Sequence, residues 1–434
     1  MIKSYSSRAA KWTAPDTNMA ADASFELWQG KIGTPLAILL RRAGYNLETQ
    51  YAHIRFFLDY TVPALGPACS PSGSIPPWQS FMTDDHTPVE LSWEWGHTGE
   101  EPSIRYALEP IGLSAGSCLD PLNLQASRNL IKELQNTVPN LDLYWYNHYA
   151  ERLLPNSHAS GSQQTAFLGK SPTETSSSSF IAYDLRRKGP VTVKAYFLPS
   201  VRAIQSNMSS LDLIVQAIRS LPEAQAGAFQ ALDLLTEFTR EDPLGSALEC
   251  DILGIDCVSE EYSRLKIYLR SRCTSFDSVR SIMTLGGRIQ CPENEQAFNE
   301  LLELWQALFF PGRKQAKSTG GDLQTCAHRT AGILYYFDFS KTKLQPVPKV
   351  YLPVRHYGKS DYLIATALRT YMKRRGKHQE ARQYLSALKE IFTSRELKNS
   401  LGAQTYIACA IKGGQLMITS YINPKIYSMP TTGN

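Results

Sequence analysis

The sequence predicts an α+β protein in which ten antiparallel strands close into a barrel, with a ring of helices outside. Three observations favour this fold. Short alternating strands come in pairs joined by polar turns, as in antiparallel hairpins. Two helices separate one pair from the next, and this unit of two helices and two strands recurs about five times. A flat sheet of this size would curl, and closure removes its exposed edges.

The strands are identified by alternation of apolar and polar residues between turn signals. In the first hairpin, residues 88–95 and 103–109 flank a loop with the sequence GHTGEEP. The other expected strands are residues 180–185, 191–198, 247–257, 264–270, 332–339, 349–354, 404–411 and 415–422.

The helices are identified by apolar residues that return on one face. The first pair covers residues 24–44 and 47–66, and the second of these ends near Pro63 and Gly66. The other expected helices are residues 120–137, 142–154, 210–221, 223–240, 275–284, 294–310, 359–375 and 378–397.

The repeated units indicate a single domain over residues 1–434. Residues from about 1 to 20 and 425–434 are expected to be flexible ends. The Ser-rich stretch 157–179 is expected to form a mobile loop.

Composition excludes several classes of protein. Hydrophobic residues make up 43% and charged residues 20% of the 434 residues, which is typical of a globular chain and not of a disordered one. The net charge of +5 is too small for a nucleic-acid-binding protein, although it allows an anionic small ligand. No apolar run approaches the roughly 18 residues of a membrane span. The N-terminal residues lack the apolar segment of a secretion signal.

The eight cysteines form no Cys-x-x-Cys pair, so we interpret them as reduced thiols of a cytoplasmic protein. We expect a monomer or a homodimer without nucleic-acid or membrane partners. The 22 tyrosines outnumber the 16 phenylalanines, which suits an aromatic cavity with polar edges.

One motif, a cation followed two residues later by Tyr, recurs on the second strand of several hairpins. It occurs as Lys194 with Tyr196, as Lys266 with Tyr268 and as Lys349 with Tyr351, and Arg264 extends the middle copy. Period two places each cation and its tyrosine on one face of the strand. A single copy would ordinarily lie on a solvated face. Repetition at equivalent places predicts instead that these residues line the barrel interior.

A cavity lined by several cations is costly unless it holds an anion such as a diphosphate. The neighbouring tyrosines offer their ring faces to a cation. Anion binding beside a shielded cation is what ionisation of an allylic diphosphate requires, because the leaving group is anionic and the intermediate is a carbocation.

With these residues placed, the chain resembles the fungal aromatic prenyltransferases of the dimethylallyltryptophan synthase type, whose fold is the αββα prenyltransferase barrel. The resemblance runs from about residue 25 to 423. It is carried by PALGP (63–67), TPVELSW (87–93), IRYALEPIG (104–112), IAYDL (181–185), VKAYF (193–197), SRLKIYL (263–269), TLGG (284–287) and VYLPV (350–354).

The resemblance implies roles for particular residues. The cations implied to grip the diphosphate are Arg105, Lys194, Arg264, Lys266, Lys349 and Lys412. The tyrosines implied to shield the allyl cation are Tyr196, Tyr268, Tyr351 and Tyr421. Glu90 matches the carboxylate that accepts the acceptor's indole N–H, and Glu94, on the same strand face, is the rival candidate. Lys349 stands where many relatives have Gln, and Met417 stands where a further shielding Tyr is frequent.

Two departures bear on the acceptor. Phe180 occupies the position where members acting on free tryptophan carry a basic Lys, and residues 247–257 contain no Arg or Lys to hold a carboxylate. Both favour a neutral acceptor at a pocket that includes Phe180 and Met417.

We therefore expect an enzyme of secondary metabolism that transfers a dimethylallyl group from dimethylallyl diphosphate to an indole-containing acceptor by electrophilic aromatic substitution. A tryptophan-containing cyclic dipeptide or a larger indole alkaloid is favoured over free tryptophan. One alternative is the same chemistry on a phenolic or polyketide acceptor such as a xanthone. A more distant alternative is a non-catalytic barrel that binds a polyanion.

No cofactor or metal is expected. Asp84, Asp85 and His86 are interpreted as turn residues before a strand, because no further Asp follows to complete a DDxxD metal motif. Gly358-Lys359-Ser360 lacks the leading glycine of a phosphate loop and is interpreted as the start of a helix, with Ser360 near its cap.

Overall fold

The barrel predicted from the sequence is present. A computed structural model describes residues 18–68, 78–96, 100–156, 177–290, 292–312 and 321–427. The strands form one closed barrel in the order β1-β10-β9-β8-β7-β6-β5-β4-β3-β2. They are β1 (Val89–Trp95), β2 (Ser103–Leu108), β3 (Ser179–Leu185), β4 (Thr192–Phe197), β5 (Glu249–Asp256), β6 (Leu265–Ser271), β7 (Ile333–Phe339), β8 (Val347–Leu352), β9 (Gln404–Lys412) and β10 (Gln415–Ile422).

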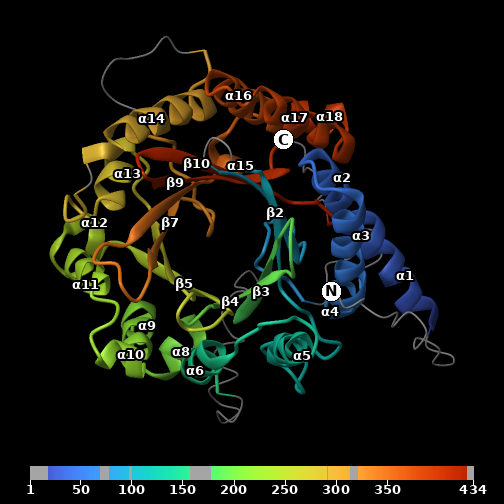
Figure 1. Cartoon of the computed structure of the whole chain (residues 1–434), viewed down its shortest axis with the longest axis horizontal. Helices are drawn as coiled ribbons and strands as arrows, with labels where there is room; N and C mark the ends of the chain where they lie inside the picture. Colours follow the sequence, from blue (N-terminus) through green and yellow to red (C-terminus); the bar gives the residue numbers. More distant parts are fainter. Residues whose placement is uncertain are drawn as a thin grey trace.

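Helices surround the barrel as an outer ring (Figure 1). They are α1 (Asn18–Trp28), η1 (Gln29–Gly33), α2 (Thr34–Arg42), α3 (Leu47–Phe56), η2 (Phe57–Thr61), α4 (Val62–Ala64), α5 (Leu124–Gln135), α6 (Tyr144–Leu153), α8 (Ser200–Gln205), α9 (Ser210–Arg219), α10 (Pro222–Gln225), α11 (Ala231–Glu241), α12 (Pro243–Ser246), α13 (Phe276–Met283), η3 (Pro292–Asn294), α14 (Glu295–Phe309), α15 (Val354–Tyr357), α16 (Asp361–Arg374), α17 (His378–Ile391) and α18 (Ser394–Asn399).

The outward face of each strand carries the apolar side chains that bury it against the helices. On β1, Leu91 and Trp93 are fully buried, and the Trp93 ring meets Tyr384 of α17 edge to face. Burying a large apolar side chain stabilises the fold by about 1.5–3 kcal/mol, so this layer supplies the main core. The polar alternate residues are thereby left to face the barrel interior.

Helix boundaries differ from the sequence prediction where the chain caps or turns. The expected helix 223–240 is divided into α10 and α11, because Gly227 and Phe229 adopt positive φ values of 93° and 64° between them. The expected helix 378–397 is divided into α17 and α18, since Thr393 begins a new helix with a capping box. Ser360 caps α16, as expected, by accepting a hydrogen bond from the Leu363 amide.

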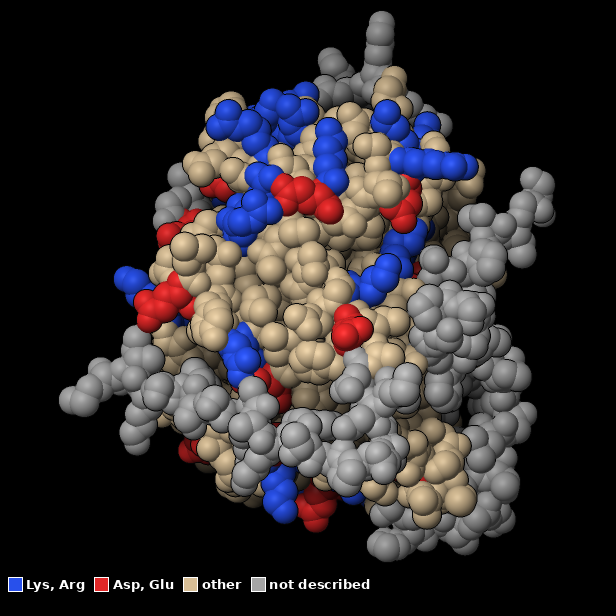
Figure 2. Space-filling model, turned by 90° about the vertical axis from the view of Figure 1, so that its right-hand side faces the viewer, with Lys and Arg blue, Asp and Glu red and all other residues tan. Residues whose placement is uncertain are grey.

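The ends and the Ser-rich stretch lie largely outside the described residues. This concerns residues 1–17, 157–176 and 428–434. In the part of the chain that is described, no helix is both long and apolar enough to cross a membrane. On the face shown in Figure 2, Lys and Arg side chains are interspersed with Asp and Glu.

Candidate active site

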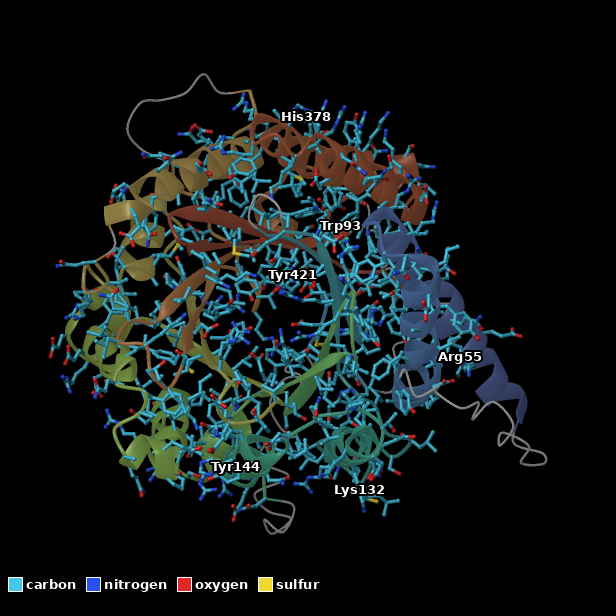
Figure 3. The ribbon with its side chains drawn as sticks, in the orientation of Figure 1. Arg55, Trp93, Lys132, Tyr144, His378 and Tyr421 are labelled. Carbon is cyan, nitrogen blue, oxygen red and sulfur yellow. The ribbon has the colours of Figure 1, made fainter. Side chains whose placement is uncertain are left out.

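The barrel interior encloses a cavity of about 390 Å³. Its lining is arranged in layers along the strands, as the inward-facing residues of β6 show. Lys266 lies toward one end, Tyr268 in the middle and Arg270 toward the other end. Figure 3 shows Tyr421 inside the ring of strands, whereas Trp93 lies between the barrel and the outer helices.

The layer at the Lys266 end is a ring of alternating charges, which we call the charge ring. In each of the first four hairpins, the first strand supplies a carboxylate and the second strand a cation. Each cation is paired across the hairpin with the residue two positions before that carboxylate, as Lys194 is with Ala182 and Lys266 with Gly254. The charge ring consists of Glu94, Arg105, Asp184, Lys194, Asp256, Arg264, Lys266, Asp338 and Lys349.

Asp256 is the most heavily paired carboxylate of the charge ring. Its oxygens lie 2.7 Å from Lys266 Nζ, 2.8 Å from Arg264 Nη2 and 3.9 Å from Lys194 Nζ. Burial would raise the pKa of Asp256, but these cations hold it well below its usual range. Burial also lowers the pKa of Lys266 to about 8, even though Asp256 favours its charged form.

Glu94 belongs to the charge ring and not to the end of the cavity where Glu90 lies. It accepts two hydrogen bonds from Arg105, one of them 2.7 Å long. Burial would raise the pKa of Glu94, but Arg105 and Lys349 lower it to about 2. Lys349 lies 3.9 Å from Glu94 and donates to Thr419, and burial lowers its pKa to about 8. Lys412 lines the same end and forms no ion pair with the described residues.

The middle layer consists of aromatic rings, which we call the tyrosine layer. Tyr268 lies 6.1 Å from Tyr196, 5.3 Å from Tyr336 and 5.9 Å from Tyr351, measured between ring centroids. Tyr421 completes the layer at 5.5 Å from Tyr351. The Lys349 ammonium lies 5.6 Å from the Tyr351 centroid, so this layer already faces one cation.

A glycine makes room for one of these rings. A Cβ at Gly254 would stand 2.8 Å from the Tyr196 ring, which is closer than real Cβ contacts. The absence of a side chain on β5 therefore lets Tyr196 lie flat against the barrel wall.

Glu90 lies beyond the tyrosine layer, at the end opposite the charge ring. It accepts a hydrogen bond of 2.6 Å from Thr405 Oγ1 on β9. Burial raises the pKa of Glu90 to about 7, although Thr405 and Arg355 act to lower it. Glu90 is therefore poised to change protonation state near neutral pH, as a general base requires.

The wall around Glu90 is mainly apolar. Phe180 stacks on Tyr196 with ring centroids 4.2 Å apart and a 3° interplanar angle. Phe180 also packs near Phe81 at 5.3 Å. The segment that carries Phe81 is held by the buried Glu109, which accepts hydrogen bonds from Trp78 and Ser80.

The structure places nearly all of the predicted site residues in this one cavity. The exception is Met417, which pairs with Ala410 on β9 and is not among the residues that line the cavity. The expectation that Met417 forms part of the acceptor pocket is corrected accordingly. It lies four residues before Tyr421 on β10, toward the turn that joins β9 to β10.

Sequence reasoning missed Tyr336 and the charge-ring carboxylates Asp184, Asp256 and Asp338, and it considered Glu94 only as a rival to Glu90. A signal was present, because an acidic residue recurs near the end of the first strand of each of the first four hairpins. These residues are Glu94, Asp184, Asp256 and Asp338. The motif of a cation followed by tyrosine lies on second strands, whereas these carboxylates and Tyr336 lie on first strands, outside that motif.

Comparison with known proteins bears on this geometry. The family model described as Tryptophan dimethylallyltransferase matches residues 25–387. The chain is 40% identical over 415 residues to 4-O-dimethylallyl-L-tyrosine synthase from Claviceps purpurea, covering 94% of this chain and 90% of that protein. It is 32% identical over 422 residues to 7-dimethylallyltryptophan synthase from Aspergillus fumigatus, covering 94% and 87%.

Among solved structures, the barrel is similar to that of NotF in complex with brevianamide F and DMSPP. The TM-score is 0.78 at 22% sequence identity, over 96% of this chain and 97% of that one. At this identity the likeness supports the fold.

Proposed function

Because the chain belongs to the tryptophan dimethylallyltransferase family, we propose that it transfers a dimethylallyl group from dimethylallyl diphosphate to an indole-containing acceptor. The observation that carries this proposal is the order of the layers. A cation-rich ring, a layer of tyrosines and a buried carboxylate follow one another along a single closed cavity. The cation-rich ring suits the leaving diphosphate, the tyrosine layer suits the carbocation, and the buried carboxylate suits the nucleophilic acceptor.

The diphosphate end is the charge ring together with Lys412. Together they hold six cations and four carboxylates, so this end of the cavity carries a net positive charge before any ligand binds. Diphosphate oxygens would take hydrogen bonds from the lysines and guanidinium groups and add negative charge where it is needed. Resident cations in this arrangement can stabilise the departing diphosphate without a metal ion.

The tyrosine layer would receive the allyl cation. When the C–O bond breaks, the electron pair leaves with the diphosphate and the positive charge stays on the C5 fragment. Five rings whose faces and edges line a buried space offer negative π density and keep water away. Their phenol groups stay neutral, since burial raises the pKa of each of them.

Glu90 would hold the acceptor. Its carboxylate accepts the indole N–H, which raises the electron density of the ring as it attacks the cation. A new bond forms between a ring atom and the allyl fragment, and a proton then leaves the ring. Glu90 and the diphosphate are the candidate bases, because the Phe180 ring cannot take a proton.

A second candidate acceptor is a phenol. The 40% identity with a tyrosine O-prenyltransferase favours it, and so does the distribution of bases. Transfer to a phenol oxygen needs only the loss of the O–H proton, and Glu90 can accept that proton directly. A basic side chain at position 180, where this chain has Phe180, is then not needed for the reaction.

We also propose a cytoplasmic location and a place in secondary metabolism. The free thiols of the described cysteines support the first, and the activities named for the relatives support the second. A non-catalytic barrel is disfavoured by the family to which the chain belongs.

The experiment that tests the proposed function is an incubation with dimethylallyl diphosphate and EDTA, read by mass spectrometry. The acceptor panel holds tryptophan, a tryptophan-containing cyclic dipeptide, tyrosine and a hydroxyxanthone. Addition of one C5 unit to an indole supports the main proposal, and addition only to phenols supports the second candidate. No C5 product from any acceptor would overturn both.

A further inference from the structure

Glu90 has one hydrogen-bond partner among the described residues, and that partner does not line the cavity. Its Oε1 accepts a hydrogen bond of 2.6 Å from Oγ1 of Thr405 on β9. Thr405 is only 1% exposed and is absent from the lining of the cavity, whereas Glu90 belongs to that lining. Thr405 therefore contacts the candidate base from behind, on the side away from a bound acceptor.

A β-bulge in β9 brings Thr405 to this place. Between two paired positions, β9 has two residues, Thr405 and Tyr406, where β10 has only Tyr421. In a regular strand neighbouring side chains point to opposite faces, so Thr405 would point away from the cavity that Tyr406 lines. The extra residue breaks this alternation, and the Thr405 hydroxyl reaches Glu90. Bulges are frequent beside active sites, where they re-aim a side chain in this way.

The two oxygens of the Glu90 carboxylate have different surroundings. Oε1 is occupied by Thr405, and within the part of the chain that the structure describes Oε2 makes no hydrogen bond. Because Glu90 lines the cavity, Oε2 is the oxygen that can accept a hydrogen bond from a ligand. Rotation of the carboxylate would break the bond to Thr405, which is strong because one of its partners is charged. The contact therefore fixes which oxygen faces the acceptor.

The other charged and titratable groups that face Glu90 do not orient it. Burial raises the pKa of Glu90, Thr405 and Arg355 of α15 act to lower it, and Asp84 from the segment before β1 acts to raise it. Tyr421 of β10 also lies within electrostatic reach of Glu90. In the described ranges, none of these side chains except Thr405 forms a hydrogen bond with Glu90. Arg355 is directed elsewhere, with its Nε 3.0 Å from Asp84 and its Nη2 donating to Tyr406 at 3.1 Å.

We propose that Thr405 is a positioning residue for the transfer reaction, which holds Oε1 of Glu90 so that Oε2 faces the N–H or O–H of the acceptor. The inference rests on the proposed function and adds a residue that acts through Glu90. Where Glu90 is the base, the acceptor's proton goes to Oε2, and the electron pair of the broken bond stays on the acceptor. Oε1 remains bonded to Thr405 throughout this step.

The same hydrogen bond sets the pH at which Glu90 works. A donor to the charged carboxylate stabilises the deprotonated form and so lowers its pKa. Without Thr405, Arg355 alone would oppose the effects of burial and Asp84, and the pKa of Glu90 would move above about 7. Loss of the Thr405 hydroxyl therefore moves the pH profile of the reaction, an effect that loss of a merely structural side chain does not have.

The test replaces Thr405 by valine, which keeps the shape and removes the hydroxyl, and by serine, which keeps the hydroxyl. kcat is measured against pH with dimethylallyl diphosphate and the acceptor that the wild type prefers, both saturating. In Thr405→Val the limb near pH 7 should move upward by about one pH unit, so that kcat at pH 7 falls by about fivefold. The KM for dimethylallyl diphosphate should stay unchanged, because the charge ring lies across the tyrosine layer. Thr405→Ser should return the limb toward its wild-type position.

Thr61→Val is the matched control. Thr61 is fully buried, and its hydroxyl forms a hydrogen bond of 2.7 Å with that of Tyr106, without contact to Glu90. This variant should lower the melting temperature much as Thr405→Val does and leave the pH profile in place. An unmoved profile in Thr405→Val, or an equal movement in Thr61→Val, overturns the role of Thr405 and leaves the proposed function standing.

A second measurement does not depend on turnover. Infrared difference spectra between the wild type and Glu90→Gln report the C=O stretch of protonated Glu90, and their pH dependence gives its pKa. The same difference taken in the Thr405→Val background should give a pKa higher by about one pH unit, and an equal pKa overturns the inference. No C5 product from any acceptor would overturn the proposed function and the catalytic part of this inference. The infrared measurement would then still decide whether Thr405 holds the Glu90 carboxylate.

Discussion

Lys266 Nζ lies 2.7 Å from Asp256 Oδ1, so a buried cation of the proposed diphosphate site is already neutralised by a carboxylate of the chain. The same holds around the charge ring, where Arg105 lies between Glu94 and Asp184. These carboxylates reduce the repulsion among buried cations while the site is empty. A diphosphate that binds here must therefore either displace these carboxylates from the cations or add its own hydrogen bonds to the existing ion pairs.

Asp256→Asn should lower the stability of the protein without a ligand more than that of the protein with diphosphate bound. Leaving Lys266, Arg264 and Lys194 without this carboxylate should cost about 3 kcal/mol. Inorganic pyrophosphate should restore much of this stability, so its effect on the melting temperature should be larger for the variant than for the wild type. Asp233→Asn, in the exposed pair with Arg219, should change neither value. An equal shift by pyrophosphate in both proteins would contradict the proposed role of Asp256.

Glu90→Gln should lower kcat by about 100-fold or more, the usual contribution of a general acid or base. The amide can keep a hydrogen bond to Thr405, but it cannot hold a proton taken from the acceptor. The KM for dimethylallyl diphosphate should be unaffected, because Glu90 lies across the tyrosine layer from the charge ring. Steady-state kinetics with each substrate varied in turn check this. A Gln variant with wild-type kcat would remove Glu90 from the chemistry.

The pH profile should have two limbs with different origins. Activity should rise through pH 7 as Glu90, whose pKa burial raises to about 7, loses its proton and becomes able to accept one. The kcat/KM for dimethylallyl diphosphate should fall above pH 8, because burial lowers the pKa of Lys266 and Lys349 to about 8 and the neutral amines bind an anion poorly.

The two limbs can be separated experimentally. Glu90→Gln should lose the limb near pH 7 and keep the one near pH 8. In kcat, the limb near pH 8 should move upward, since bound diphosphate stabilises the charged lysines. A kcat/KM profile that stays flat between pH 6 and about 9 would be inconsistent with these assignments.

Gly254→Ala should impair binding of the donor's allyl group. The added methyl group would come within 2.8 Å of the Tyr196 ring and push it into the cavity. We expect the KM for dimethylallyl diphosphate to rise about tenfold, a change of ~1.4 kcal/mol, and a longer donor such as geranyl diphosphate to suffer more. Gly30→Ala is the control, because a Cβ there meets nothing within 4 Å. Unchanged KM values for both donors would show that Tyr196 has space to move.

The sequence predicts the barrel well because its signals are local and repeated. Each hairpin can be recognised from the alternation of apolar and polar residues and from the turn residues between its strands. Because this unit occurs five times, few arrangements other than a barrel would bury all the apolar faces. Helix ends are predicted less well, since they depend on single residues such as Thr393, whose capping box divides one expected helix into two.

The candidate site is predicted in part for a similar reason. Lys194, Lys266 and Lys349 repeat with their tyrosines, so their common face can be deduced from spacing. Arg329 cannot be found in this way, because it lies outside the strands and reaches the cavity only through the fold. The pairing of Asp256 with its cations likewise depends on which strands become neighbours.

The barrel is closed by strands from nearly opposite ends of the sequence, since β1 pairs with β10, Leu91 opposite Ile422. During synthesis the early hairpins can form as they leave the ribosome, but the pairing of β1 with β10 cannot form until β10 has been made. Such distant pairing slows folding, and until it forms the sheet has two open edges that can join other chains. Water reaches the interior charges throughout this time, so their burial is delayed until the final strand docks. The cavity is thus a late product of folding, and a ribosome-bound chain without β10 has no closed chamber in which a carbocation could survive.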